Sequence, residues 1–437
     1  MTTRRDFLKL GGGAAALSMV AACQPAATEN ATKDVAMIDS MLIDPKMIDF
    51  GQSIDRQGTD SVKWDGRAAI FGTDDVVPLW VADMDFASPP AVRAALVERA
   101  AHPVYGYTQV PERLYDSLIG WQKQRHGWEV ERDWAAVTPG VVPVLYAAVR
   151  ALTRAGEGVI VQPPVYTPFF SAVTENDRRL MLNPLREQDG HYSMDFDNLE
   201  QCARDGGKLL LLCSPHNPVG RVWRRDELQT LLDIARKHDL IVVSDEIHAD
   251  LVYAPNTHIP LAMLEDMPER VMTVLAPSKS FNIPGMGLAF MLCGEPELRS
   301  RVRAEFTRLH IESNNPFSLV AAEAAYRHGA GWLDVLMHYL AKTQDLVLDY
   351  CAAYLPGIRA LRSEGTFLMW LDCRALAQAR GLDDRALLRL LVEKAKVGMS
   401  SGVIYGQGGE GFMRLNIGAP RQVIMDALER IKQALTA

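Results

Sequence analysis

The feature that most constrains the fold is a regular alternation, from about Val137 onward, of short apolar runs with amphipathic stretches. Five short runs, at 159–161, 208–213, 240–243, 271–275 and 288–292, are rich in Leu or β-branched residues, as strands buried on both faces are. Between two of them, residues 226–238 carry one apolar stripe at helical spacing. This alternation predicts βαβ units, and therefore an α/β fold with a mostly parallel sheet between helices.

The C-terminal third of the chain has a different pattern. A long helical pattern runs from 297 to about 328, and a second from 332 to about 354. Strands are expected at 367–371 and 412–416, and helices at 384–396 and 422–436. We expect a smaller α+β domain made of residues 44–88 and 326–437, and a large domain of residues 89–325.

The N-terminal segment is typical of a targeting signal. Arg4 and Arg5 stand in a twin-arginine export pattern at residues 3–9, and the weakly apolar stretch 10–22 is too short to span a bilayer permanently. Residues 20–23, Val-Ala-Ala-Cys, resemble a lipobox, although they also suit a plain cleavage site. We therefore expect a signal at 1–23, a tether at 24–43, export by the twin-arginine machinery to the periplasm, and membrane contact only through a lipid on Cys23.

Composition narrows the classes of partner. The 437 residues carry a net charge of −8 without any long basic run, which argues against a nucleic-acid footprint. The cysteines other than Cys23 number five at irregular spacings, and neither CxxC nor HExxH occurs, so neither a disulfide framework nor a metal site is expected. A small molecule is the expected partner.

Three polar residues follow predicted strands. Lys279 lies just past the run 271–275, where ligands bind in open α/β sheets, and partial desolvation there would lower the pKa of its amine and make it a nucleophile. Asp245 closes another run; it could cap a turn, or it could face a cationic ring nitrogen. Asn217 stands in Ser-Pro-His-Asn-Pro-Val-Gly, which is first of all a turn, although its amide could also reach a ligand oxygen.

Gly140 marks a fourth element of a ligand site. It precedes an apolar helical segment, 144–152, and a glycine followed by a helix N-terminus can cradle a phosphate through backbone amides. By itself this signal is weak.

Together, Asn217, Asp245 and Lys279 resemble the constellation of the fold-type I pyridoxal-phosphate (PLP) enzymes, the class I/II aminotransferase family, over residues 44–436. Four motifs resemble the cystathionine β-lyase and C–S lyase branch of that family. They are Arg-Gln-Gly-Thr-Asp-Ser-Val-Lys-Trp-Asp at 56–65, Pro-Leu-Trp-Val-Ala-Asp-Met-Asp-Phe at 78–86, Val-Tyr-Gly-Tyr-Thr at 104–108 and Asp-Glu-Ile-His-Ala-Asp-Leu at 245–251.

The resemblance implies an aspartate aminotransferase-like fold, PLP as cofactor and a role for each matching residue. Lys279 would bind the cofactor as an imine, Asp245 would pair with its pyridinium nitrogen, and Asn217 would contact its phenolic oxygen. His248 would assist at that oxygen, where typical aminotransferases have a tyrosine, and Tyr166 would stack on the ring. The remaining matches are Gly140, Val141, Val142 and Ser278 at the phosphate, Tyr107 reaching the phosphate from the other subunit of a homodimer, and Arg414 and Ala82 at the substrate, with Arg414 clamping its carboxylate. Gly287 departs from the pattern, because many aminotransferases have a phosphate-binding arginine there, and the phosphate contacts are open at this point.

The same resemblance implies a β-elimination on cystathionine or cysteine S-conjugates that gives a thiol, pyruvate and ammonia. An aminotransferase would use the same groups with an oxo-acid acceptor, and the sequence barely separates the two. A non-catalytic binding or regulatory protein with this fold is the third alternative. Loss of the catalytic lysine would have favoured that alternative, and Lys279 is present.

Overall fold

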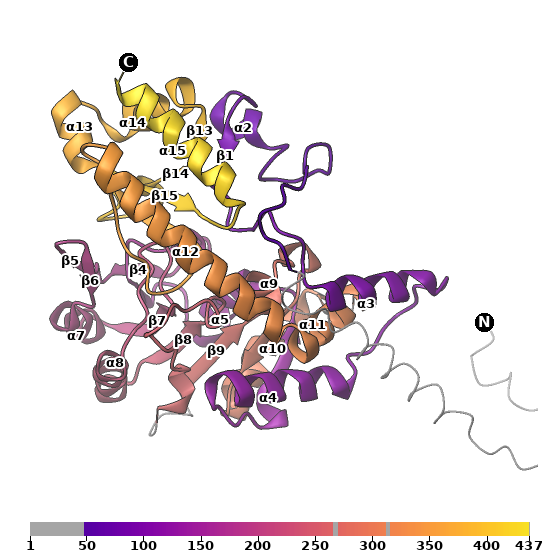
Figure 1. The fold of residues 1–437 in the computed structure, drawn as a ribbon. Coiled ribbons are helices and arrows are strands. Elements are labelled where there is room, and N and C mark those ends of the chain that lie inside the picture. The colour runs from indigo at the N-terminus through magenta and orange to yellow at the C-terminus, as the bar shows by residue number, and fades with distance from the viewer. Residues whose placement is uncertain (1–47, 265–269, 312–314, 437) are drawn as a thin grey trace, which may run out of the picture. The chain divides into compact units, whose positions relative to one another are not determined.

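A seven-stranded sheet carries the larger part of the fold (Figure 1). The computed structural model describes residues 48–264, 270–311 and 315–436, and the predicted signal and tether lie outside these residues. In sheet order the strands are β2 Ala135–Thr138, β10 Ala289–Leu292, β9 Val271–Leu275, β8 Ile241–Asp245, β7 Gly207–Cys213, β3 Gly158–Val161 and β4 Arg179–Leu182. β10 is antiparallel to both of its neighbours, and the other pairs are parallel. The predicted mostly parallel α/β sheet is confirmed.

The sheet is buried on both faces because side chains alternate along each strand. In β7, Leu209 and Leu211 belong to one apolar cluster, together with α5 Val141–Leu152 and α10 Pro296–Arg308. Leu210 and Leu212 point the other way, into a cluster with α8 Arg225–Lys237. The uninterrupted apolar run that indicated the strand therefore serves two helical layers.

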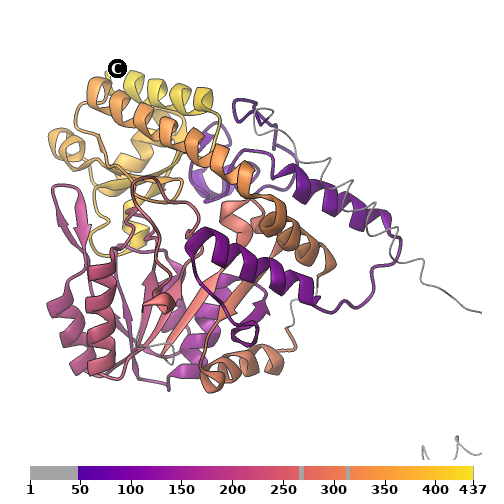
Figure 2. The ribbon, with the colours of Figure 1, turned by 60° about the horizontal axis from the view of Figure 1, so that its bottom comes forward.

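A smaller, four-stranded antiparallel sheet follows in the C-terminal part. Its order is β11 Arg359–Ala360, β12 Leu368–Asp372, β15 Phe412–Asn416 and β14 Ser400–Ser401. The helix α12 Ala330–Tyr354 runs beside α15 Arg421–Thr436, the yellow C-terminal helix, in both views (Figures 1 and 2). From the N-terminal side, β1 Val77–Pro78 pairs in parallel with β13 Val397–Gly398. The predicted boundaries at 88/89 and 325/326 stay predictions.

The remaining elements are short or connect these sheets. The other helices are α2 Arg67–Phe71, α3 Pro90–Ala101, α4 Glu112–His126, α6 Pro168–Thr174, α7 Phe196–Arg204, α9 Pro277–Ser280, α11 Pro316–His328, α13 Arg374–Arg380 and α14 Asp384–Arg389. A hairpin joins β5 Arg186–Gln188 to β6 His191–Ser193, and single turns occur at Arg132–Trp134, Leu261–Met263, Pro284–Met286, Leu390–Lys394 and Gly402–Tyr405.

Two helical expectations need correction. The pattern from 297 to 328 holds two helices in the described residues, α10 and α11, and Pro316 begins the second, as proline often does. The helix expected at 384–396 is α14 followed by a π-helical turn, Leu390–Lys394. Within the described ranges, no helix is both long and apolar enough to cross a bilayer, and no group of three or more potential ligand residues is arranged to hold a metal ion.

Candidate active site

Neighbouring strands of the large sheet bring the predicted site residues to one edge. Cys213, the last residue of β7, is paired in register with Asp245, the last residue of β8. Lys279 lies in α9, directly after β9. Because the carboxyl ends of these parallel strands meet, the side chains line one cavity of about 260 Å³. Of the predicted residues, the cavity is lined by Ala82, Gly140, Val141, Val142, Tyr166, Asn217, Asp245, His248, Ser278 and Lys279, and by Gly287.

The Lys279 amine is mostly buried and points at a backbone carbonyl. Its Nζ atom donates to the carbonyl oxygen of Ala82 across 2.7 Å. The pKa of the amine is lowered to about 8, mainly by burial; the charges of Asp83 and Asp245 oppose this effect, and that of Arg414 adds to it. A lysine with this pKa is partly unprotonated near neutral pH, as a nucleophile or a general base requires.

Asp245 is a buried carboxylate that forms no ion pair with any of the described residues. Among the described residues, its carboxylate accepts one hydrogen bond, from the Ile247 backbone N–H at 3.1 Å. Burial raises the pKa of this carboxyl to about 7, and the Ile247 donor and the Lys279 charge offset the rise only in part. A cation in the cavity would restore the ionised form. The pyridinium nitrogen of the predicted cofactor is such a cation, so this side chain fits PLP.

Arg414, in the middle of β15 in the smaller sheet, contacts one predicted cofactor residue, Asn217. Its Nη1 donates to Oδ1 of Asn217 across 3.2 Å, and its Nη2 donates to the Trp80 carbonyl oxygen. The guanidinium also lies over the Tyr405 ring, 5.2 Å from its centroid. Its buried Nε has no hydrogen-bond partner in the described part of the chain. Arg414 is therefore next to the cavity with donor capacity to spare, as a carboxylate clamp needs.

The start of α5 forms another wall of the cavity. Gly140 caps this twelve-residue helix, and Val141 and Val142 form its first turn, whose backbone amides have no partners within the helix. Ser278 lines the cavity beside them. Gly287, where many aminotransferases have an arginine, adopts a left-handed conformation with φ of 58° and supplies no side chain. A phosphate here would be held by amides and a hydroxyl.

Two ring side chains complete the cavity. Tyr166, the residue predicted to stack on the cofactor ring, lines the cavity, and burial raises the pKa of its phenol. His248 is buried, and burial lowers the pKa of its imidazole to about 3, helped by the charges of Lys279 and Arg414. The imidazole is neutral at physiological pH, and its Nδ1 has no hydrogen-bond partner among the described residues. It is free to meet a ligand oxygen.

Neither Tyr107 nor Arg414 lines the cavity, and Tyr107, unlike Arg414, contacts none of the described residues that do. It is fully exposed on the connection between α3 and α4, near the exposed side chains of Val104 and Tyr105. Its predicted role, at the cavity of a second subunit, stays a prediction.

Asp250 is a buried residue that contacts Ser280, the neighbour of Lys279, and the sequence-based predictions do not include it. Asp250 accepts from Ser280 Oγ at 2.7 Å, from Trp121 Nε1 at 3.0 Å and from His126 Nε2 at 2.9 Å. Burial alone would raise the pKa of Asp250, but the hydrogen bond and charge of His126 and the Ser280 and Trp121 donors lower it below its ordinary value. Asp250 thus fixes the residue next to Lys279. In the sequence it is the second aspartate of the motif at 245–251.

Comparisons with known proteins identify the family and the fold. Residues 74–431 match the family model "Aminotransferase class I and II". Cystathionine beta-lyase PatB of Bacillus subtilis is 41% identical over 391 residues, 89% of this chain and 100% of that protein. Cystalysin from Treponema denticola, whose crystal structure contains pyridoxal 5′-phosphate, is 38% identical with a TM-score of 0.86, covering 89% of this chain and 99% of that one. The PLP-bound C–S lyase from Staphylococcus hominis is 30% identical with a TM-score of 0.83, covering 89% and 98%.

Proposed function

This chain belongs to the aminotransferase class I and II family, and from that premise we propose that it is a PLP-dependent carbon–sulfur β-lyase. The observation that carries the proposal is the cavity where Lys279, Asp245 and Asn217 meet. The reaction is taken from its relatives, since proteins named as a cystathionine β-lyase and a C–S lyase match the chain along nearly its whole length. We propose cystathionine or cysteine S-conjugates as substrates.

The residues that would hold PLP follow from their places around the cavity. Lys279 would bind it covalently, Asp245 would face the pyridine nitrogen, and Asn217 and His248 would meet the phenolic oxygen. Tyr166 would lie against the ring. The amides of Gly140, Val141 and Val142 and the Ser278 hydroxyl would hold the phosphate. When bound, PLP supplies a ring that accepts the electron pair left at the substrate's α-carbon.

The chain's own side chains carry the steps around that chemistry. Arg414 binds the substrate carboxylate and so fixes which bond at the α-carbon faces Lys279. The freed Lys279 amine takes the α-proton, and the Ala82 carbonyl, 2.7 Å from Nζ, accepts a hydrogen bond from the resulting ammonium. The β-carbon–sulfur bond then breaks and the thiolate leaves. Addition of water releases pyruvate and ammonia.

The direct test is to assay pyruvate from purified protein and cystathionine with no oxo acid present. Pyruvate at a rate that depends on Lys279 is the expected result, with Lys279→Ala as the matched control. Turnover only after an oxo acid is added, without pyruvate formation, would replace the lyase with an aminotransferase. PLP binding without any turnover would favour a binding or regulatory protein.

We also propose a homodimer whose sites are shared between subunits. The support is the exposed apolar group Val104, Tyr105 and Tyr107, which a lone chain leaves in solvent. Analytical ultracentrifugation of the PLP-loaded protein tests the dimer, and a sedimentation coefficient of a monomer at micromolar concentration would contradict it.

Export remains a proposal of its own. The Arg4-Arg5 pair and the sequence ending in Cys23 support twin-arginine export to the periplasm and lipidation of Cys23. Cell fractionation and mass spectrometry of the N-terminal peptide test both steps. Arg4→Lys with Arg5→Lys should retain the protein in the cytoplasm, and Cys23→Ala should remove the lipid but not the export.

A further inference from the structure

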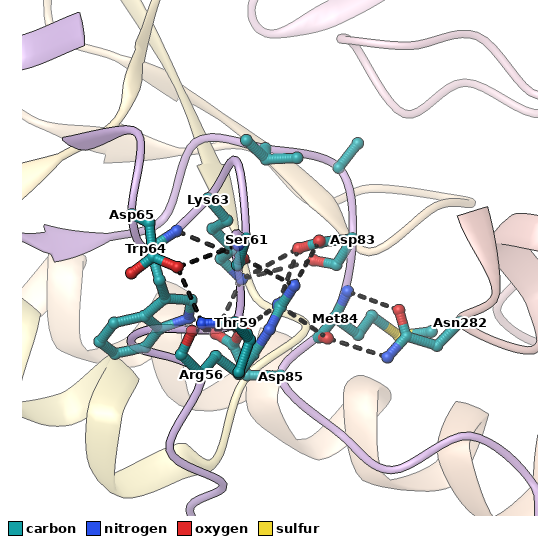
Figure 3. A network of polar contacts seen from close by, with 12 residues as sticks. Arg56, Thr59, Ser61, Lys63, Trp64, Asp65, Asp83, Met84, Asp85 and Asn282 are labelled. Atoms are coloured by element: carbon teal, nitrogen blue, oxygen red, sulfur yellow. Dashed lines mark hydrogen bonds and ion pairs between the residues drawn. The ribbon is translucent and has the colours of Figure 1, made fainter. Parts of the chain in front are cut away.

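Two motifs from separate parts of the N-terminal region meet in a cluster of four charged side chains, Arg56, Lys63, Asp83 and Asp85, called here the Arg56 cluster (Figure 3). Arg56 pairs with Asp83 and with Asp85, each at 2.7 Å. Lys63 pairs with Asp85 at 2.7 Å and lies 3.8 Å from Asp83. Trp64 Nε1 also donates to Asp85, at 2.9 Å. The formal charges, two positive and two negative, balance.

The burial of the Arg56 cluster indicates more than a contribution to stability. The Lys63 side chain is 0% exposed, and that of Asp85 is 5% exposed. Removing such charges from water costs several kcal/mol per ion, and apolar replacements of buried ion pairs are often as stable or more so. A buried charged cluster is better explained by a need to keep one conformation of the chain. Here the segment whose conformation the cluster fixes is residues 80–85.

That segment presents two backbone carbonyls to the candidate active site. The Trp80 carbonyl accepts from Arg414, and the Ala82 carbonyl accepts from Lys279. The Lys279 side of the site holds the same segment, because Asn282 accepts from the Met84 N–H at 2.9 Å and donates to the Met84 carbonyl at 2.8 Å. Ala82 is thus adjacent to Asp83, a member of the Arg56 cluster. Two residues after Ala82, Met84 contacts Asn282, which lies three residues after Lys279.

We propose that Arg56 and Lys63 are positioning residues for Lys279, which act through Asp83 and Asp85 to hold the Ala82 carbonyl against the lysine's amine. The inference rests on the proposed function, in which Lys279 binds PLP and later moves a proton. Neither Arg56 nor Lys63 lines the cavity, so neither is a catalytic residue.

Because the charges in the cluster balance, removing one of them should change the pKa of Lys279 in a defined direction. The charged and titratable groups that face Lys279 are Asp83, Asp245, Arg414 and His248. Asp83 raises the pKa of Lys279, against the effect of burial. Loss of a cation from the cluster leaves an excess negative charge beside the amine and should raise that pKa. Loss of Asp83 leaves an excess positive charge and should lower it.

The experiment follows imine formation between the apo protein and PLP, measured by absorbance over a range of pH. The rate depends on the unprotonated fraction of the Lys279 amine, so its pH midpoint reports the amine's pKa without any lyase turnover. Lys63→Met should move the midpoint up, and Asp83→Asn should move it down, each by roughly half a unit or more, a roughly threefold rate change at fixed pH. The double variant should return close to the wild-type midpoint.

Two further variants separate positioning from a loss of folding. Arg56→Met should behave like Lys63→Met, and Arg56→Lys, which keeps the charge, should stay near the wild type. Because the Arg56 side chain is 22% exposed, this pair keeps the test open even if Lys63→Met does not fold. Leu232 lies in the apolar cluster that contains α8, so Leu232→Ala should lower the melting temperature without moving the midpoint.

Shifts of the two single variants in the same direction, or no shift in any variant, would overturn the proposal. Failure of the proposed function gives a different result, since the wild-type protein would then form no imine with PLP at any pH.

Discussion

Asn217 and Arg414 lie 197 residues apart in the chain, and the Arg414 guanidinium donates to Oδ1 of Asn217 across 3.2 Å. An amide whose oxygen is occupied in this way turns its NH₂ group elsewhere. Asn217 lines the cavity, so its two donors remain for the phenolic oxygen proposed above. One contact therefore joins the residue expected to bind the substrate to a residue expected to bind the cofactor.

Arg414→Lys should weaken substrate binding far more than cofactor binding. Lysine is a point charge and cannot reproduce a bidentate contact with a carboxylate. Loss of one charge-assisted hydrogen bond costs about 1.5–3 kcal/mol, so KM should rise roughly ten- to a hundredfold. Steady-state kinetics checks this, with Arg359→Lys on the same sheet as a control. An unchanged KM would remove Arg414 from the substrate site.

Asp245→Asn should stabilise the apo protein at alkaline pH. The unfolded chain ionises this carboxyl near pH 3.8, whereas burial keeps it protonated up to about pH 7 in the folded protein. Stability is therefore fully present below pH 3.8 and is lost as pH rises to about 7, by roughly 4 kcal/mol. At pH 8 the apo variant should melt at a higher temperature than the wild type, and near pH 4 the difference should largely vanish. A lower melting temperature at pH 8 would contradict the unpaired state of this carboxylate.

The same variant should lose turnover while it keeps the cofactor. Without the carboxylate, the pyridine nitrogen is no longer held protonated, and the ring is a poorer electron acceptor. We expect covalent PLP with kcat reduced by at least about a hundredfold, within the range that positioned charge contributes to catalysis. Absorbance and pyruvate assays on one sample check both halves. Full turnover would show that the assignment of Asp245 is wrong.

Asp250→Asn should destabilise the fold and loosen the residue next to Lys279. The Asp250 carboxylate accepts from three side chains, and one hydrogen bond to a charged group contributes about 1.5–3 kcal/mol, so Asp250→Asn should cost at least that much. Ser280→Ala, which removes only one of the donors, should cost about 1–2 kcal/mol. The pKa of Asp250 is lowered, so its contribution is present at neutral pH and fades as pH falls below 3.8. Urea unfolding at pH 7 and at pH 3 tests the size and the pH dependence together. Equal free energies of unfolding for Asp250→Asn and the wild type at pH 7 would contradict this role.

Co-expression tests whether Tyr107 serves the partner's site. Lys279→Ala and Tyr107→Ala chains should each be impaired as homodimers. In a mixed dimer, one site combines an intact lysine with an intact tyrosine from the other chain, so part of the activity should return. If each chain used its own Tyr107, every site would carry one defect and no activity would return.

The sequence predicts the elements whose side chains are buried on both faces. β7, β8 and β9 consist mainly of buried apolar residues, and the polar residues at or just after their ends meet because parallel strands end at one edge. β4 is not indicated, because only Met181 of its four residues is buried and no pattern shows. The composition of β10 also does not indicate that this strand is antiparallel to its neighbours.

Contacts between distant segments are the part that local pattern does not reveal. Asp83 and Arg56 stand in motifs that the resemblance singles out, yet nothing local says that they pair with each other. Asp250 likewise reads as one more acid beside Asp245 until the fold brings Ser280 to it. Both depend on packing between elements that are far apart in the chain.

The central claim is that Lys279 holds PLP covalently in the cavity that Asp245 and Asn217 share. Borohydride reduction of the PLP-treated protein, followed by peptide mass spectrometry, tests it most directly. We expect one pyridoxyl-phosphate adduct, on Lys279, and none in Lys279→Ala. An unmodified Lys279, or an adduct confined to another lysine, would contradict the account.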